Sequence, residues 1–196
     1  MEEKRLTIEE RKALLSLVRS TLADRLRGKG SAAAPELAGL AGLAVHRGAF
    51  VTLTEDGELR GCIGTFRADR PLSDVVRQMA LQAALHDPRF EPVRAEELDR
   101  LEVEVSALTP LREIKDVSEI EVGRHGIYIT RGVHGGVLLP QVAVEWGWGR
   151  EEFLAHTCLK AGLPPDAWKK GATIEIFSAE VFSEEDIEGK KVVCGK

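Results

Sequence analysis

The segment Leu59–Phe66, LRGCIGTF, contains the residue best suited to covalent chemistry, the thiol of Cys62. Gly61 and Gly64 interrupt an otherwise good strand, where a glycine often marks a bulge or a close approach of backbone or ligand. Strand alternation places Arg60 and Cys62 on one face, with Cα atoms roughly 6.5 Å apart. A guanidinium at that distance would favour the nucleophilic thiolate. The alternative is a small cysteine packed where only glycine neighbours fit.

Two other segments offer polar partners for such a thiol. In the motif HDPRF, Asp87 is suited to capping a turn and Arg89 to holding an anionic group or a carboxylate. The alternative is a helix-terminating turn that contains an ion pair. His125 shares a strand face with Ile127, the side expected to be buried. It is either a base near Cys62 or a structural histidine whose two ring nitrogens are both satisfied. We expect Arg60, Cys62, Arg89 and His125 to surround one concavity.

Motifs for other ligands are missing from the sequence. The five histidines show no HxxxH spacing and the cysteines no close pair, so we predict no metal site. Neither GxGxxG nor GxxxxGK[ST] occurs, and we predict no cofactor. The Trp146-Gly147-Trp148 segment could form a stacking platform. Because no basic stripe surrounds it, core packing or a partner surface is the favoured use.

The elements that position these residues follow from periodicity, capping residues and turn signals. Thr7 and Glu10 have the spacing of a capping box, and Asp56-Gly57 predicts a tight hairpin turn. We predict helices over 7–27, from Pro71 or Ser73 to Asp87, and over 150–161, and strands over 48–54, 58–66, 101–108, 125–130, 136–139 and 172–181. Because the strands cluster in hairpins, the pattern favours an α+β fold with mainly antiparallel sheet and flanking helices.

Composition narrows the class of protein. The chain has 196 residues with 27 basic and 32 acidic side chains, a net charge of −5. This balance argues against nucleic-acid binding and against an anionic membrane surface. Three cysteines without a close pair indicate reduced thiols. The sequence shows no signal peptide and no apolar run long enough to cross a membrane, so we expect a cytoplasmic location.

Several motifs together resemble the AMMECR-type domain family, known in prokaryotes as AmmeMemoRadiSam system protein A. The resemblance runs from about Phe50 to Phe182 through these segments: LRGCIGTF, DPRF, EELDRLEVEVSALTPL, GRHGIYI, LLPQVAVEWGW and FLAHTCLKAGLPPDAW. It implies an α+β fold with a larger and a smaller subdomain. It also implies an association with Memo-like and radical SAM proteins, but no particular reaction.

The resemblance and the residues together give the candidate site and the domain organisation. The catalytic candidates are Cys62, Arg60 and His125, and the ligand-binding candidates are Gly61, Gly64, Asp87, Arg89 and Glu145. We predict a single domain over 1–196, with an N-terminal helix over about 7–27, a core over about 50–182 and a flexible tail over about 183–196.

Two readings of function remain open. The first is a non-catalytic module that binds a small ligand or a partner protein and acts with the Memo-like and radical SAM proteins. The second is a thiol-dependent enzyme or covalent carrier centred on Cys62. Nucleic-acid binding, suggested by eukaryotic relatives, is a distant alternative that the negative charge opposes.

Overall fold

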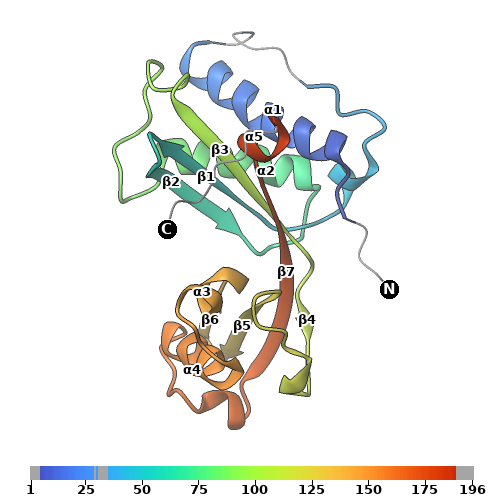
Figure 1. Ribbon diagram of the computed structural model, residues 1–196, viewed down its shortest axis with the longest axis vertical. Helices are drawn as coiled ribbons and strands as arrows, with labels where there is room; N and C mark the ends of the chain where they lie inside the picture. The colour runs from blue at the N-terminus through green and yellow to red at the C-terminus, as the bar shows by residue number, and fades with distance from the viewer. Residues whose placement is uncertain (1–4, 29, 31–34, 189–196) are drawn as a thin grey trace. The chain divides into compact units, whose positions relative to one another are not determined.

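The computed structural model describes residues 5–28, 30 and 35–188. The chain divides into two compact units, which we describe separately (Figure 1): unit 1 comprises residues 1–108 and 180–196, and unit 2 comprises residues 109–179. Each unit has its own cluster of buried apolar side chains. Two such cores agree with the larger and smaller subdomains that the family resemblance implies.

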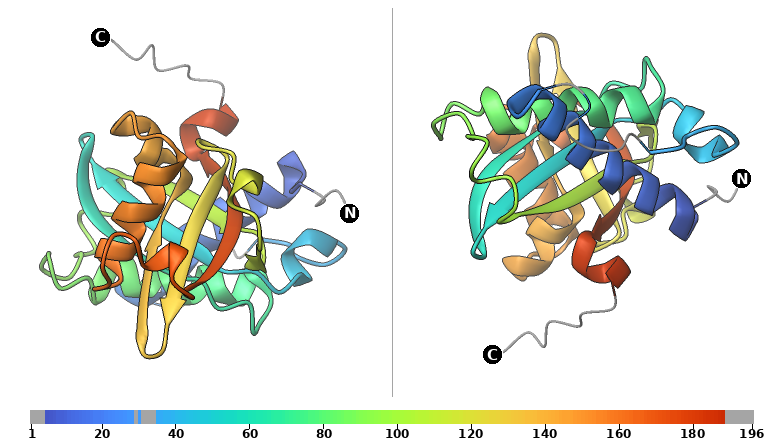
Figure 2. Two further views of the ribbon diagram at one scale, coloured as in Figure 1. Left: turned by 90° about the horizontal axis from the view of Figure 1, so that it is seen from below. Right: turned by 90° about the horizontal axis from the view of Figure 1, so that it is seen from above.

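In unit 1 the strands follow the order β2-β1-β3, with antiparallel pairing of β1 to both neighbours, and β7 comes next to β3 in the same sheet. Its elements are α1 Ile8–Leu26, the 3₁₀ helix Ala41–Ala44, β1 Ala49–Glu55, β2 Glu58–Thr65, α2 Leu72–Leu85, β3 Leu101–Leu108, the end of β7 Thr173–Ser183, and α5 Glu184–Glu188. Alternate residues such as Val51 and Val105 are fully buried on one sheet face. Helices α1 and α2 pack on that face, as Figure 2 shows in its right-hand view.

Helix α1 begins where its capping box predicts. The Thr7 hydroxyl accepts the Glu10 N–H, and the Glu10 carboxylate accepts the Thr7 N–H. The segment predicted as a flexible tail from about residue 183 starts differently, because α5 occupies Glu184–Glu188. Arg19 of α1 anchors this helix through an ion pair with Glu184 at 2.5 Å. Residues 189–196 of the predicted tail lie outside the described residues.

The hairpin between β1 and β2 is confirmed. Asp56 and Gly57 have φ values of 53° and 79°, and Glu55 lies opposite Glu58. Two successive positive φ values are the signature of a primed turn, whose twist matches that of the strands it joins. Glycine at the second position accepts that conformation without a Cβ clash.

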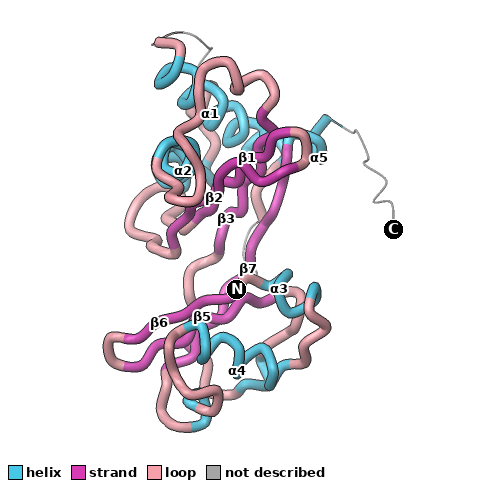
Figure 3. The backbone as a smooth tube through the Cα atoms, turned by 90° about the vertical axis from the view of Figure 1, so that its left-hand side faces the viewer, coloured by secondary structure: helices cyan, strands magenta, loops and turns pink. Residues whose placement is uncertain are grey.

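Unit 2 is built on β5, which pairs with both β6 and β7 in antiparallel register. Its elements are β4 Arg112–Glu113, a 3₁₀ helix Val117–Glu119, β5 His125–Arg131, β6 His134–Leu138, α3 Pro140–Glu145, α4 Arg150–Lys160, a 3₁₀ helix Ala167–Lys169 and the first part of β7. Figure 3 shows α4 running beside β5 and β6. The predicted α+β architecture is therefore confirmed, but α3 and α5 were not predicted.

Candidate functional site

Strand β2 is irregular at the site of the LRGCIG motif. Thr54 lies opposite Leu59, whereas Leu53 lies opposite Gly61, so Arg60 is an extra residue that bulges out of the pairing. A bulge breaks the alternation of side chains along a strand. Leu59, which a regular strand would place on the same face as Gly61 and Ile63, is 40% exposed. The side chains before and after Arg60 therefore do not follow one regular alternation.

The outer edge of β2 is closed at Cys62 by the DPRF motif. The Asp87 carboxylate accepts the Cys62 N–H at 2.9 Å, and the Arg89 guanidinium donates to the Cys62 carbonyl at 3.2 Å. Arg89 also bonds Asp87 through Nε at 2.9 Å and through its terminal nitrogen at 2.6 Å. Together the two side chains satisfy backbone groups that an edge strand would otherwise leave unpaired. We call this arrangement the Asp87–Arg89 clamp.

The charge of Asp87 is stabilised by the clamp itself. Its hydrogen bonds with the Arg89 side chain hold the pKa of the buried Asp87 carboxyl far below its usual range, although burial alone would raise it. The N–H groups of Cys62 and Arg89 contribute in the same direction. The guanidinium of Arg89, proposed from sequence as an anion ligand, is thus already bound to a carboxylate. These contacts match the alternative interpretation of the HDPRF motif, a helix-terminating turn that contains an ion pair.

Arg60 is held in a second, similar contact. Its Nε donates to Glu97 at 2.8 Å and another nitrogen donates to the Glu91 carbonyl at 2.9 Å. Both Arg60 and Glu97 side chains are only 16% exposed. Burial opposes ionisation of Glu97, but the hydrogen bonds from Arg60 and from the Arg94 N–H lower its pKa. Arg60 is thus engaged with Glu97, and the guanidinium that bonds the backbone of residue 62 belongs to Arg89. A role for Arg60 beside the thiol stays a prediction.

The two glycines of the motif permit close packing. A Cβ on Gly61 would lie 3.1 Å from the Ala83 carbonyl carbon of α2 and closer still to its oxygen. A Cβ on Gly64 would overlap the Phe50 ring and lie 2.7 Å from the Ala49 carbonyl oxygen. Both glycines thus have a packing role, which leaves their ligand-binding role a prediction.

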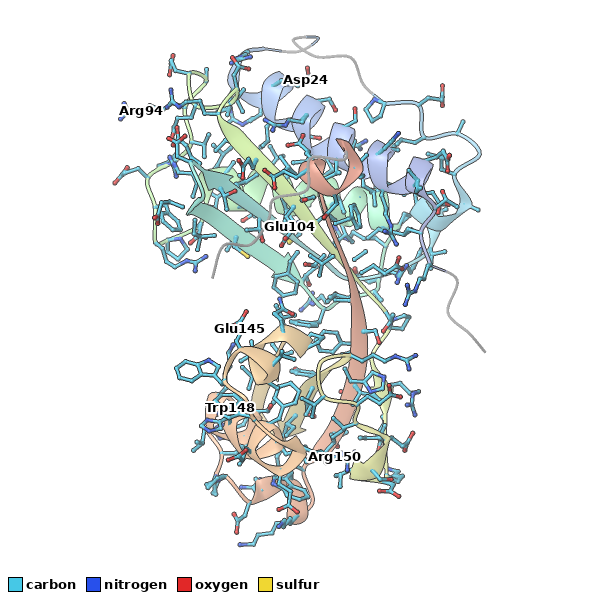
Figure 4. All side chains as sticks on the ribbon, viewed as in Figure 1. Asp24, Arg94, Glu104, Glu145, Trp148 and Arg150 are labelled. Atoms are coloured by element: carbon cyan, nitrogen blue, oxygen red, sulfur yellow. The ribbon has the colours of Figure 1, made fainter. Side chains whose placement is uncertain are left out.

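The thiol of Cys62 faces the sheet surface that α1 and α2 do not cover. It is partly exposed and accepts a hydrogen bond from the Thr52 hydroxyl, with an oxygen–sulfur distance of 3.3 Å. The register places Cys62, Thr52 and Glu104 side by side across the three strands. Burial, reinforced by the nearby Asp186, raises the pKa of Glu104. Figure 4 labels Glu104 on this sheet.

A depression adjoins this row on the same unit. It has a volume of about 200 Å³ and is lined by β1, β3 and the junction between β7 and α5. Thr52, Thr54 and Glu104 contribute side chains to its wall. The depression therefore presents hydroxyl and carboxyl groups next to the row that contains the thiol.

His125 and Glu145 belong to unit 2, and each is described within that unit. The His125 Nδ1 atom accepts the Glu121 N–H at 3.1 Å. Burial lowers the pKa of the imidazole, partly offset by the Glu121 carboxylate. The neutral ring then carries its proton on Nε2, which makes this nitrogen a donor rather than a base. Glu145 ends α3 and is exposed.

Sequence reasoning missed Thr52, Glu104 and Glu97. The hairpin turn is readable from the sequence and gives an approximate strand pairing. The bulge at Arg60 shifts that pairing by one residue, so the partner of Cys62 could not be read directly. Glu97 lies within the EELDRL segment that the family resemblance included, but its contact with Arg60 spans 37 residues.

The described residues contain neither a metal-binding cluster nor a membrane-spanning helix. No three His, Cys, Asp or Glu side chains in this part of the chain are arranged to hold a metal ion. Among the same residues, no helix is both long enough and apolar enough to cross a membrane.

Fold and site define an α+β protein of two compact units, with a glycine-flanked cysteine on a clamped edge strand. A family model described as AMMECR1 matches residues 15–182, and the chain belongs to this family. The chain is 45% identical over 196 residues to Protein MK0488 of Methanopyrus kandleri, and the match covers 94% of this chain and 93% of that protein. A Thermococcus gammatolerans protein is 51% identical over 149 residues, covering 70% and 73% of the two chains.

A solved structure supports the fold. The chain is similar to the crystal structure of uncharacterized protein PH0010 from Pyrococcus horikoshii, with a TM-score of 0.74 and 43% identity. The match covers 88% of this chain and 90% of that one. The resemblance to the AMMECR-type family is thereby confirmed. The names of these relatives state no activity, ligand or partner.

Proposed function

We propose that the protein is a binding module whose sheet face opposite α1 and α2 in unit 1, around Cys62 and Thr52, receives a small ligand or a segment of a partner protein. One observation carries this proposal: the arginines that a thiol enzyme would use are committed to structural contacts. Arg89 bonds Asp87 and the backbone of residue 62, and Arg60 bonds Glu97. The thiol then has the Thr52 hydroxyl as its hydrogen-bond partner.

The partners proposed for this module are a Memo-like protein and a radical SAM protein. This part rests on the resemblance to AmmeMemoRadiSam system protein A. It is tested by mixing the purified chain with each of these proteins from the same genome and measuring binding by interferometry. Binding that survives Cys62→Ser and weakens with Glu104→Arg would support the sheet face as the contact. Absence of binding to either protein, with cross-linking included, would overturn direct partnership.

The alternative function is thiol chemistry at Cys62. Its support is that the sulfur is partly exposed and accepts a hydroxyl hydrogen bond, whereas Cys158 is fully buried. A nucleophilic thiol would need an activating base or cation within reach.

Alkylation of the native protein with iodoacetamide, followed by peptide mapping, separates the two functions. For a binding module, the rate at Cys62 rises linearly with reagent concentration and matches that of a small model thiol within about tenfold. Cys158 serves as the protected internal control. A rate at Cys62 that is more than about a hundredfold faster and saturates with reagent would favour the enzyme.

A further inference from the structure

Three aromatic rings are stacked on the surface of unit 2. The Trp146 and Trp148 rings have centroids 5.9 Å apart and planes inclined by 17°. The His156 ring lies against Trp148 with centroids 3.8 Å apart and planes inclined by 1°. We call these three residues the ring ladder. Trp146 ends the ladder and is 69% exposed, which leaves it much accessible ring surface.

The chain between α3 and α4 builds this ladder. Trp146 caps the end of α3, and Gly147 then adopts a φ of 66°, which reverses the chain. The Trp148 N–H returns to the Ala143 carbonyl at 2.8 Å, and α4 begins directly after Gly149. Because glycine accepts a positive φ without strain, this short turn can place two indoles next to each other.

Core packing accounts for only part of the ladder. Trp148 packs against the unit 2 core, whereas Trp146 does not belong to that cluster. Two further large apolar side chains are exposed on the same two helices, Val144 at 61% and Leu159 at 53%. A concentration of exposed tryptophan and aliphatic side chains is typical of protein–protein interfaces, where tryptophan is a frequent anchor.

An exposed carboxylate beside the ladder offers a counter-charge to a cation. Glu145 precedes Trp146 and is exposed, and Figure 4 labels it on the same side of unit 2 as Trp148. Glu152, one turn before His156 on α4, is engaged otherwise, because its carboxylate accepts the Gly149 N–H at 2.9 Å. Of the nearby bases, Arg150 donates through Nε to the Ile120 carbonyl, and Lys160 ends α4 one turn after His156.

We propose that the ring ladder docks a partner protein that inserts an arginine side chain against the open face of Trp146. A guanidinium is planar and cationic, so it can stack on an indole face while its N–H groups reach the carboxylate of Glu145. A nucleobase would bring phosphates towards Glu145 in a chain with a net charge of −5, which disfavours nucleic acid. This proposal does not depend on the Cys62 surface, which lies in the other unit.

The three indole N–H resonances of the ¹⁵N-labelled protein provide the test, because all three tryptophans lie in unit 2. The probe is a capped (Gly-Arg)₄ peptide, compared with (Gly-Lys)₄ of equal charge. We expect saturable shifts at Trp146, smaller ones at Trp148 and none at Trp168, whose ring is already covered by the Lys169 ammonium at 4.5 Å. The lysine peptide should bind at least about threefold more weakly, because its ammonium is not planar.

Matched variants identify the surface. Trp146→Ala should weaken binding of the arginine peptide about tenfold, and Glu145→Gln several-fold. Val133→Ala, at a hairpin tip that is 98% exposed, should bind as the wild type does. Equal binding of the two peptides, or unchanged binding by Trp146→Ala, would show attraction by net charge alone and overturn the proposal. Shifts at Trp146 with an oligosaccharide or oligonucleotide, but not with the arginine peptide, would overturn it as well.

Discussion

Replacing Gly61 with alanine tests whether the glycine in the RGCIG strand is required for packing. The new Cβ would lie 3.1 Å from the carbonyl carbon of Ala83 and nearer still to its oxygen. Both atoms are backbone atoms of α2, so neither can rotate away as the end of a side chain can. To relieve the contact, β2 and α2 must separate along a fully buried interface that includes Val76 and Ala80.

The expected loss follows from this geometry. Overpacking a close-packed interior costs about 1–3 kcal/mol, and a backbone–backbone conflict belongs at the upper end of that range. For a chain of this size, each kcal/mol lowers Tm by about 2–4 °C. We therefore expect Gly61→Ala to melt about 5–10 °C below the wild type, and Gly61→Val to melt lower. Cys62→Ser is the matched control in the same strand, because serine keeps a hydroxyl partner for Thr52.

Two spectroscopic probes make the result specific to unit 1. The three tryptophans are all in unit 2, so their fluorescence follows that unit, whereas far-ultraviolet circular dichroism follows both. If the units unfold separately, Gly61→Ala shifts only the transition that fluorescence does not report. If they unfold together, both probes shift equally. A Tm for Gly61→Ala equal to that of Cys62→Ser would refute the crowding argument.

Three further predictions concern the charged groups of unit 1. Asp87→Asn should lower the unfolding free energy, measured by urea titration, by about 1–3 kcal/mol at pH 7. The pKa of Asp87 is lower in the folded than in the unfolded chain, so the wild type has its full advantage over the variant above about pH 5. This advantage should shrink as the pH falls through the folded pKa. Glu104→Gln should raise Tm at pH 7. Folding raises the pKa of Glu104, so the wild type loses stability as the pH rises through that pKa and the carboxyl ionises. A lower Tm for the variant would contradict this. A double-mutant cycle of Arg60→Ala and Glu97→Ala should give a coupling of about 1–2 kcal/mol, and additive losses would count against the contact.

The regular parts of the fold could be predicted because their signals are local. The capping box of Thr7 and Glu10 and the turn at Asp56-Gly57 each depend on residues within three positions of one another. Helix α3 was missed because Pro140–Glu145 is too short to show helical periodicity. Helix α5 has only five residues, so it also shows no periodicity. The contact that anchors it comes from Arg19, 165 positions away in the sequence, and a local pattern cannot indicate it.

The candidate site was predicted less well because one backbone irregularity changes its geometry. In a regular hairpin that closes at Glu55 and Glu58, each step back along β1 is matched by one step forward along β2, so Gly61 would lie opposite Thr52. The extra residue in the bulge shifts the pairing by one position and brings Cys62 opposite Thr52. No residue type in LRGCIGTF specifies where the extra residue falls. The glycines signal an irregularity, and the packing of α2 against Gly61 is what fixes its place.

The contacts of the clamp give one physical reason for residues of two separate motifs to occur together. Strand β2 is at the edge of its sheet, and an unprotected edge invites pairing with other chains. Asp87 and Arg89 close that edge at Cys62 by occupying its N–H and its carbonyl, without adding another strand. A peptide strand that tried to extend the sheet at this point would have to displace a buried, ionised carboxylate. The proposal of a ligand or partner around Cys62 therefore requires an approach from the sheet face, where the thiol bonds the Thr52 hydroxyl, and not from the strand edge.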